Sequence, residues 1–179
     1  MVDLALLQSI SYMAGALGVC VAAIYYVFNM RLTLETRRLG LIDNIVNRFL
    51  DEEGNKRYFE LMNYEWTDYA DFAKKYDSAN NVESASKRFA VWTNFNEIGM
   101  MLRKGFVKVE DLYVLGMAGI PFHWKKYKPI VEEVRRRYNG KEYLKDMEYL
   151  ASKMLKYMQT KDPSFMVPEK LDKYDARHL

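Results

Sequence analysis

The chain has 179 residues, a formal net charge of +3 and a single cysteine, Cys20. Such a small positive excess argues against a dedicated nucleic-acid-binding surface, and one cysteine excludes a disulfide framework or a cluster of thiolate metal ligands. The length suits one domain with one hydrophobic core beside any membrane segment.

The first element is the run 4–30, which contains no charged side chain. A helix needs roughly 20 apolar residues to cross a bilayer, so this run predicts a transmembrane helix. A cleaved signal peptide is one alternative, but it begins with a positive region and has a shorter apolar core, whereas this chain begins Met1-Val2-Asp3. A buried helix of a soluble domain is the other, and it is seldom apolar on all sides.

Arginines follow this run and none precedes it. Arg31, Arg37 and Arg38 come directly after the apolar segment, and positive residues remain on the cytoplasmic side of a membrane span. We therefore expect a single-pass protein of the cell membrane with its N-terminus outside, residues 31–179 in the cytoplasm, and these arginines in contact with lipid headgroups.

Small residues recur along one face of the predicted span. Ala14, Gly18 and Ala22 are spaced four apart, so they form a stripe on which two helices can approach closely in lipid. Glycine and alanine are also simply common in membrane helices, which is the plainer interpretation. The stripe predicts a helix–helix interface and a homo-oligomer.

The rest of the chain has helical spacing of its apolar residues and no convincing strand pattern. We predict an all-α fold in which one N-terminal transmembrane helix (1–30) is followed by a cytoplasmic bundle of five to six helices (31–162) and a flexible C-terminal tail (163–179). The expected helices continue from the membrane to about residue 51 and then cover 58–76, 84–103, 109–115, 121–138 and 142–158. Turns are expected at 51–55, where Gly54 ends a helix, and at Asn139-Gly140.

Glu97 is a carboxylate that stands among core-facing residues of a predicted helix. It is expected either to pair with a cation from another helix, Arg135 being the candidate, or to serve as a functional acid with a raised pKa. The structural ion pair is the favoured interpretation because no second catalytic group accompanies it.

No motif for catalysis, phosphate binding or metal binding occurs in the chain. The only histidines are His123 and His178, far apart in sequence. Neither follows an arginine at the spacing typical of helical ribonucleases. The basic residues of 125–137 alternate with acidic ones, as on a solvated helix face. We expect no enzyme activity, no cofactor and no metal, and we regard nucleic acid as an unfavoured partner.

Four segments in the second half of the chain resemble an uncharacterised family of small membrane-anchored helical proteins, a domain of unknown function. They are Trp92-Thr-Asn-Phe-Asn-Glu-Ile-Gly99, then Leu102-Arg-Lys-Gly-Phe-Val107, then Trp124-Lys-Lys-Tyr-Lys-Pro-Ile-Val-Glu-Glu-Val-Arg135, and Tyr143 with Met147-Glu-Tyr-Leu150. Met147 stands where the family's pattern has an aromatic residue. The resemblance implies one N-terminal span and a cytoplasmic helical domain, with Glu97 and Arg135 as partners inside the bundle, and it implies no activity.

The sequence therefore predicts a membrane-anchored helical scaffold or regulatory protein that self-associates and binds the bilayer and a protein partner. An oligomeric pore lined by the single spans is the alternative. A membrane-tethered nuclease or hydrolase is the least favoured, because no nucleophile or acid–base pair is visible.

Overall fold

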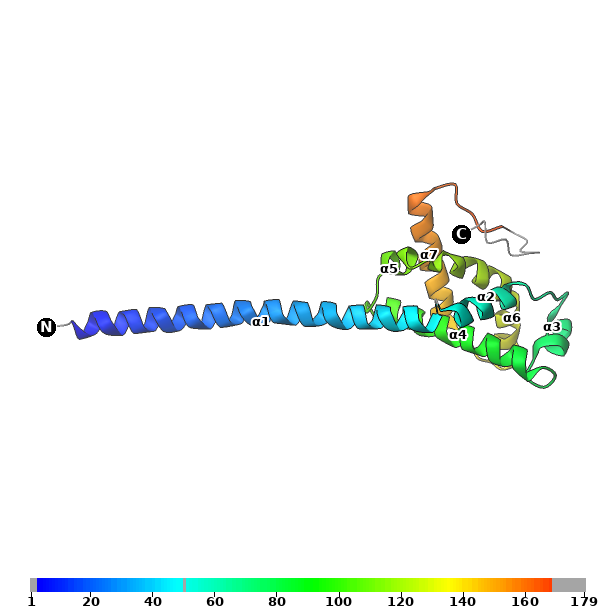
Figure 1. The fold of residues 1–179 in the computed structure, drawn as a ribbon, viewed down its shortest axis with the longest axis horizontal. Coiled ribbons are helices and arrows are strands. Elements are labelled where there is room, and N and C mark those ends of the chain that lie inside the picture. Colours follow the sequence, from blue (N-terminus) through cyan, green and yellow to red (C-terminus); the bar gives the residue numbers. More distant parts are fainter. Residues whose placement is uncertain (1–2, 50, 169–179) are drawn as a thin grey trace. The chain divides into compact units, whose positions relative to one another are not determined.

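The structure is a computed structural model that describes residues 3–49 and 51–168, and every regular element in these residues is helical. It confirms the predicted all-α fold, a long apolar N-terminal helix followed by a helical bundle (Figure 1). The elements are α1 (Leu4–Phe49), α2 (Glu52–Met62), α3 (Tyr69–Tyr76), α4 (Val82–Arg103), α5 (Val109–Val114), the 3-10 helix η1 (Met117–Gly119), α6 (Ile120–Arg137) and α7 (Lys145–Lys161).

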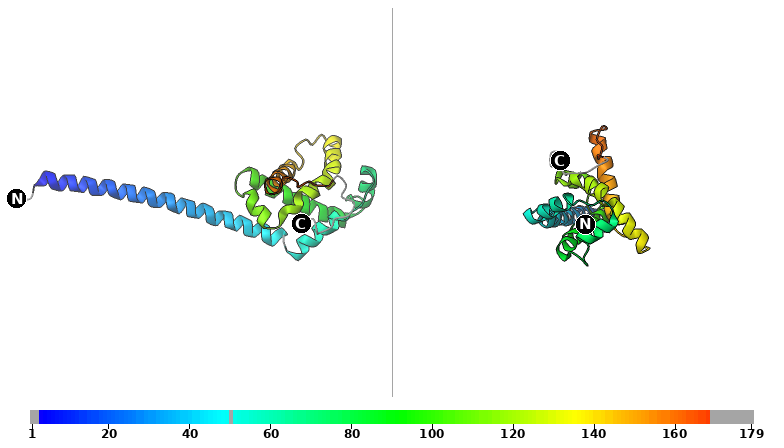
Figure 2. Two further views of the ribbon diagram at one scale, coloured as in Figure 1. Left: turned by 90° about the horizontal axis from the view of Figure 1, so that it is seen from above. Right: turned by 90° about the vertical axis from the view of Figure 1, so that its right-hand side faces the viewer.

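The chain divides into two compact units, Met1–Gly40 and Leu41–Leu179. The first consists of α1 residues that are almost all exposed, with only Arg38 reaching intermediate burial among residues 3–40. The second contains the hydrophobic core. α1 runs through Gly40 without a break, as the predicted continuation to about residue 51 requires (Figure 2).

The last turns of α1 belong to the core of the second unit. Ile45 and Phe49 are 4% and 7% exposed, and the Phe49 ring stacks on the Phe95 ring of α4 at 5.1 Å. Aromatic and aliphatic side chains buried to this degree contribute on the order of 2 kcal/mol each to folding. The helix that carries the apolar run therefore also supplies part of the domain.

The turn expected at 51–55 is shorter than predicted. Asp51 caps α2 by accepting a hydrogen bond from the Gly54 backbone N–H at 2.8 Å, a typical N-cap interaction. Gly54 lies in the first turn of α2 and ends no helix. A Cβ atom at Gly54 would lie 2.5 Å from the Phe49 carbonyl oxygen, so glycine is needed there because the new helix starts directly against the end of α1.

The helix expected over 58–76 is two helices, α2 and α3, separated by residues 63–68. Asp68 begins the second one by accepting from the Asp71 backbone N–H at 2.9 Å. The end of α2 is held from α6, where Tyr127 donates its hydroxyl to the Leu61 carbonyl at 2.7 Å and Lys126 donates to the Met62 carbonyl at 2.8 Å. Large apolar residues keep helical spacing through residues 63–68, so the periodicity of the sequence does not reveal the break.

α4 packs against α7 more extensively than any other pair of helices. A Cβ atom at Gly99 would overlap the Asp146 carbonyl group, so only glycine allows this approach. Asn96 Oδ1 accepts from the backbone N–H groups of Asp146 and Met147 at 3.1 and 3.2 Å. A side chain of α4 thereby caps the N-terminus of α7, whose own cap residue, Leu144, offers no side-chain hydrogen bond.

The remaining helices follow the predicted ranges closely. α6 ends at Arg137, and Asn139 adopts φ +50°, the left-handed conformation expected at this turn. The final helix begins at Lys145, three residues later than predicted. Of the predicted tail, 163–168 are described and Phe165 packs on Phe122 at 6.0 Å, while the rest, including His178, lies outside the described residues.

Candidate membrane anchor and domain cavity

The described residues contain one helix that is long and apolar enough to cross a membrane, α1, judged by length and composition. None of its most apolar 18-residue stretch is buried within the chain. Large apolar side chains project on every side of it, with exposed fractions from 48% at Met30 to 81% at Leu4. The core helix of a soluble protein buries such a surface. The buried-helix alternative is therefore not supported.

The small-residue stripe is open along the helix. A Cβ atom added at Gly18, or at the neighbouring Gly15, would meet nothing within 4 Å, and Ala14 and Ala22 are likewise exposed. Within residues 3–49 and 51–168, no packing accounts for small residues at these positions. An interface through Ala14, Gly18 and Ala22 stays a prediction.

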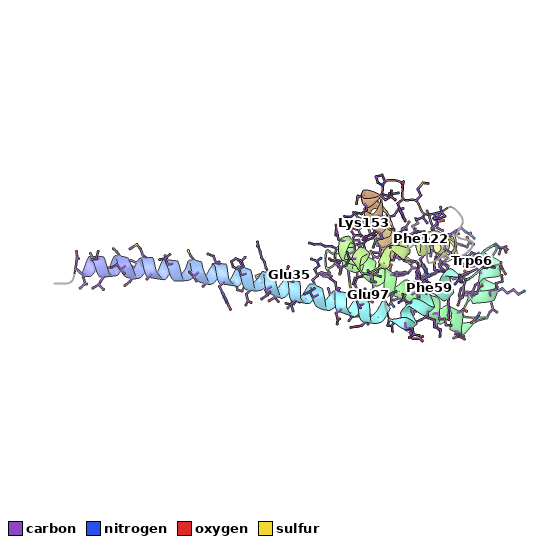
Figure 3. The ribbon with its side chains drawn as sticks, turned by 45° about the horizontal axis from the view of Figure 1, so that its top comes forward. Glu35, Phe59, Trp66, Glu97, Phe122 and Lys153 are labelled. Atoms are coloured by element: carbon purple, nitrogen blue, oxygen red, sulfur yellow. The ribbon has the colours of Figure 1, made fainter. Side chains whose placement is uncertain are left out.

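The arginines that follow the apolar run differ in their environment. Arg31 and Arg37 are exposed, whereas Arg38 is half-buried. Glu35 is exposed between them (Figure 3). Contact of the three arginines with lipid headgroups also stays a prediction.

Glu97 and Arg135 have different partners from those expected. Glu97 Oε2 pairs with Arg48 Nη1 of α1 at 3.3 Å, in an ion pair whose side chains are 39% and 58% exposed. Figure 3 shows Glu97 beside the C-terminal part of α1. Arg135 Nη1 pairs with Glu148 Oε2 of α7 at 2.8 Å. Glu97 belongs to the side of α4 that meets α1, whereas Arg135 meets α7, so the structure replaces the expected pair with two others.

His123 is fully buried in the domain, and the sequence indicates no role for it because it has no partner at motif spacing. Its Nε2 atom accepts a hydrogen bond from Trp92 Nε1–H at 3.1 Å, which leaves the proton of the neutral ring on Nδ1. The Nδ1 atom is buried and has no hydrogen-bond partner in the described structure. Burial, with a smaller contribution from the nearby Lys126 charge, lowers the pKa of His123 from 6.5 to about 3, so the ring is neutral.

Aromatic rings surround His123 on several sides. The ring centroids of Tyr127, Phe95 and Tyr58 lie 4.7, 5.3 and 5.6 Å from that of the imidazole. In this position the imidazole accepts from Trp92 and packs like an aromatic core residue. It is shielded from solvent, which makes it unsuited to exchange protons with a substrate.

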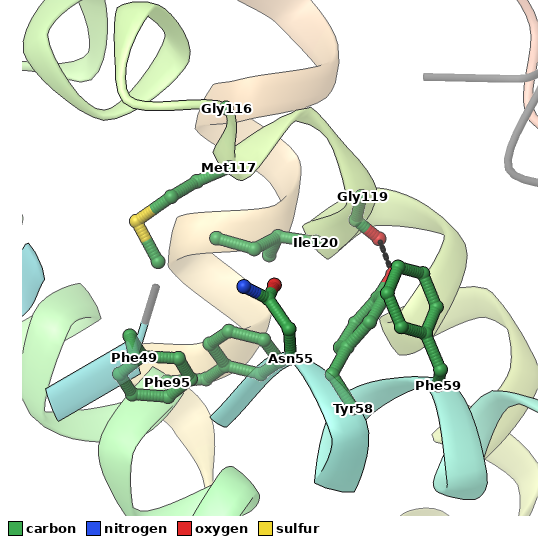
Figure 4. Close-up of a pocket in the computed structure, with 9 residues that line it drawn as sticks. All are labelled: Phe49, Asn55, Tyr58, Phe59, Phe95, Gly116, Met117, Gly119 and Ile120. Atoms are coloured by element: carbon green, nitrogen blue, oxygen red, sulfur yellow. Dashed lines mark hydrogen bonds between the residues drawn. The ribbon is translucent and has the colours of Figure 1, made fainter. Parts of the chain in front are cut away.

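A cavity of about 60 Å³ lies beside this cluster (Figure 4). Its walls come from the end of α1, from α2 and α4, and from the segment between α5 and α6. They comprise the rings of Phe49, Phe95, Tyr58 and Phe59, the aliphatic side chains of Met117 and Ile120, the amide of Asn55 and two glycines. No charged side chain lines it.

Tyr58 fixes one wall of this cavity. Its hydroxyl donates to the Gly119 carbonyl at 2.9 Å, and its ring meets the Phe95 ring edge-on at 6.2 Å. These contacts tie α2 to α4 and to the start of α6. The arrangement can hold a small uncharged group. Within residues 3–49 and 51–168, no group of three or more His, Cys, Asp or Glu residues is placed to hold a metal ion.

Comparison with known proteins identifies a family whose model matches most of the chain. The family model described as "Domain of unknown function (DUF4760)" matches residues 13–154. The match begins inside the apolar run and ends within α7, so it includes parts of both units. No curated protein and no solved structure matches the chain.

Proposed function

The chain belongs to the DUF4760 family, a domain of unknown function, and from its structure we propose that it is a single-span membrane protein. In this proposal α1 anchors the helical domain at the cell membrane, and the domain works in the cytoplasm as a scaffold or regulator of a protein partner. The observation that carries the proposal is the exposure of the apolar run of α1 on all sides.

The distribution of apolar surface supports an anchor. A helix with apolar side chains around its whole circumference is stable when lipid covers it, because lipid removes that surface from water and the helix satisfies its own backbone hydrogen bonds. Ser9 and Ser11 donate their hydroxyls to the carbonyls of Ala5 and Leu7 at 2.9 Å each. The polar groups near the start of the run are therefore also satisfied within the helix.

The proposed orientation of the span follows from the positions of the arginines. Arg31, Arg37 and Arg38 adjoin the C-terminal side of the run, and no Lys or Arg occurs in residues 1–30. Arginine near a span end remains in the cytoplasm, so the domain faces the cytoplasm in this proposal. Protease added to intact cells or right-side-out vesicles should leave the domain undigested and should digest it once the membrane is opened. Digestion in sealed right-side-out vesicles would reverse the orientation.

Self-association is part of the proposal and rests on the open stripe of Ala14, Gly18 and Ala22. Cross-linking and mass measurement of the detergent-solubilised chain should give an oligomer that Gly18→Leu weakens, because a large side chain keeps the two backbones apart. Val19→Leu, a substitution on an adjacent face, is the matched control. A strict monomer would contradict self-association, and it would also remove the pore alternative, which liposome flux tests directly.

The contacts of three titratable side chains favour a binding role for the domain over an enzymatic one. Glu97 is engaged with Arg48, Arg135 with Glu148, and the His123 ring is buried against Trp92. Each of these groups has a structural role. Purification of the tagged full chain from membranes, with the Gly99→Leu variant as an unfolded control, should recover a protein partner that requires the folded domain.

A further inference from the structure

A surface hollow of about 370 Å³ lies over the first half of α4, beside the loop that joins α3 to α4. This volume is within the range of small-molecule binding sites in proteins. Most of its wall is apolar and comes from α4, including Val82, Ala85 and Phe89, and Tyr143 adds a wall from the segment before α7. Val82 and Phe89 are 68% and 67% exposed, so the described part of the chain leaves this apolar surface largely uncovered.

Arg88 is the cationic residue among those that line this hollow. Its side chain is only 13% exposed. The carbon of its guanidinium lies 5.0 Å from the ring centroid of Phe72 and 5.1 Å from that of Trp92. Stacking on aromatic faces holds an arginine in place and does not use its N–H groups. The two rings therefore fix a positive charge at an apolar hollow and leave its donors available.

Most of the hydrogen-bonding capacity of Arg88 is unused. Nη2 donates to Asp77 Oδ1 at 3.2 Å, whereas Nε and Nη1 have no hydrogen-bond partner within residues 3–49 and 51–168. The Asp77 side chain is 42% exposed, and a single contact with a partly exposed carboxylate is weak. Because a guanidinium carries several N–H donors in a rigid planar fork, Arg88 can bind a second carboxylate beside Asp77.

Hydroxyl groups supply further donors around the hollow. Ser78, Ser86 and Tyr143 line it, and their hydroxyls make no hydrogen bond in the part of the chain that the structure describes. Burial raises the pKa of the Tyr143 phenol above its usual value, so this hydroxyl stays protonated and able to donate. A guanidinium and hydroxyl donors beside apolar walls suit a ligand with a carboxylate at one end and a hydrocarbon chain at the other.

We propose that this hollow binds a small aliphatic monocarboxylate, whose carboxylate accepts hydrogen bonds from Arg88 and whose chain contacts Val82, Ala85 and Phe89. A cavity of 150 Å³ holds benzene, and this hollow has more than twice that volume, which suits a chain of about five to seven carbon atoms. The site lies within the second unit. It depends neither on the membrane anchor nor on the proposed protein partner, so either proposal can fail without the other.

Hexanoate and hexanamide provide the test, since they have nearly the same shape and differ in charge. Each probe is titrated by calorimetry into the full chain held in detergent micelles, and the heat of titration into micelles alone is subtracted. Hexanoate should bind saturably, with one site per chain. Hexanamide should bind at least about 10-fold more weakly, because charge-assisted hydrogen bonds are roughly twice as strong as neutral ones.

Two substitutions locate the binding in the hollow. Ser86→Leu should weaken hexanoate binding by about 10-fold or more, because the larger side chain fills the space that the ligand needs. Thr93→Leu, on an exposed position of α4 that does not line the hollow, is the matched control and should bind as the natural chain does. Arg88→Gln removes the charge and should weaken hexanoate binding by about 10-fold.

Arg88 also pairs with Asp77, so the urea midpoint of Arg88→Gln is measured beside its affinity. Ser86→Leu leaves that ion pair in place and keeps the test independent of any loss of stability. Hexanoate binding that does not saturate, hexanamide binding of equal strength, or hexanoate binding that is unchanged in Ser86→Leu or in folded Arg88→Gln would overturn the proposal.

Discussion

The two units of this chain use the same residue types for opposite purposes. In Met1–Gly40, leucine, isoleucine and phenylalanine side chains are exposed and glycines have open space around them, whereas in Leu41–Leu179 the same types form a closed core and glycine permits contact. Gly18 and Gly99 show this most clearly. A Cβ atom at Gly18 would meet nothing within 4 Å in the part of the chain that the structure describes, and one at Gly99 would collide with the Asp146 carbonyl.

Under the proposed anchor, this difference corresponds to two solvents, lipid and water. A segment that is apolar all round and packs on nothing is suited to lipid, where no hydrophobic effect forces it to fold against itself. A segment with alternating polar and apolar faces is suited to water and folds into a bundle. In that proposal α1 belongs to both, because its residues 41–49 supply Ile45 and Phe49 to the core.

The boundary between the units can be tested by truncation, for which we expect the largest effect. A fragment that begins at Gly40 should fold as a soluble helical domain, whereas one that begins at Asp51 lacks Ile45 and Phe49 and should lose at least about 4 kcal/mol of stability. Urea unfolding followed by tryptophan fluorescence measures this, since all three tryptophans lie beyond residue 50. Equal stability of the two fragments would show that the end of α1 is no part of the domain.

The second-largest effect on stability is expected from the substitution of a glycine in each unit. Gly99→Ala should destabilise the domain of the full chain by about 3 kcal/mol or more, because α4 and α7 must move apart to admit a methyl group. Gly15→Ala should change the same unfolding transition by less than about 0.5 kcal/mol. A small effect at Gly99 would mean that α4 and α7 approach less closely than the structure shows.

Acid should weaken the domain through His123. Its pKa is about 3 in the folded chain and near 6.5 when unfolded, so below pH 6.5 the unfolded chain binds a proton that the folded chain does not. Stability is therefore full above pH 6.5 and falls by about 1.5–2 kcal/mol between pH 6.5 and pH 5. The carboxylate of Glu133, whose pKa is held at about 2 by Arg136 and Arg137, contributes only at lower pH.

Replacement of the imidazole isolates this effect. His123→Gln should remove the loss of stability between pH 6.5 and pH 5, whatever its effect on stability at pH 7. Urea midpoints at several pH values provide the measurement. A slope that survives the substitution would assign it to another group and contradict the neutral, buried state of His123.

The ion pair of Glu97 should have the smallest effect. Arg48 and Glu97 are 58% and 39% exposed, and exposed pairs contribute less than about 1 kcal/mol. Glu97→Gln should therefore cost about 0.5 kcal/mol or less, and Glu148→Gln about 1 kcal/mol because its partner Arg135 is only 17% exposed. A cost above about 1.5 kcal/mol at Glu97 would show a role that this pair does not explain.

The sequence predicted the positions of the helices better than the contacts between them. Periodicity found α4, α5 and α6, and Asn139-Gly140 marked a turn that the structure contains, because these signals are local. The break between α2 and α3 was missed because Met62, Trp66 and Tyr69 keep helical spacing although Trp66 lies in the loop between the two helices. Phe89 has core spacing in α4 and is nevertheless 67% exposed.

The contacts of the candidate site depend on positions far apart in the chain, which periodicity does not supply. Glu97 has its expected character as a paired residue but meets Arg48, and the Trp92–His123 hydrogen bond joins α4 to α6. The cavity combines residues from 49 to 120. Spacing within one helix indicates which side faces inward, and tertiary packing decides what that side meets.

Cys20 offers the most direct test of the anchor, because it is the single cysteine of the chain, is exposed on α1 and lies within the apolar run. A membrane-impermeant maleimide should leave Cys20 unmodified in intact membranes and in membranes opened by freeze–thaw, and should modify it fully after the membranes are dissolved in SDS. A Cys20→Ser, Thr36→Cys variant, with its cysteine outside the bilayer core, should react in opened membranes. Rapid modification of Cys20 in intact or opened membranes would show that water reaches the middle of this helix and would contradict a transmembrane anchor.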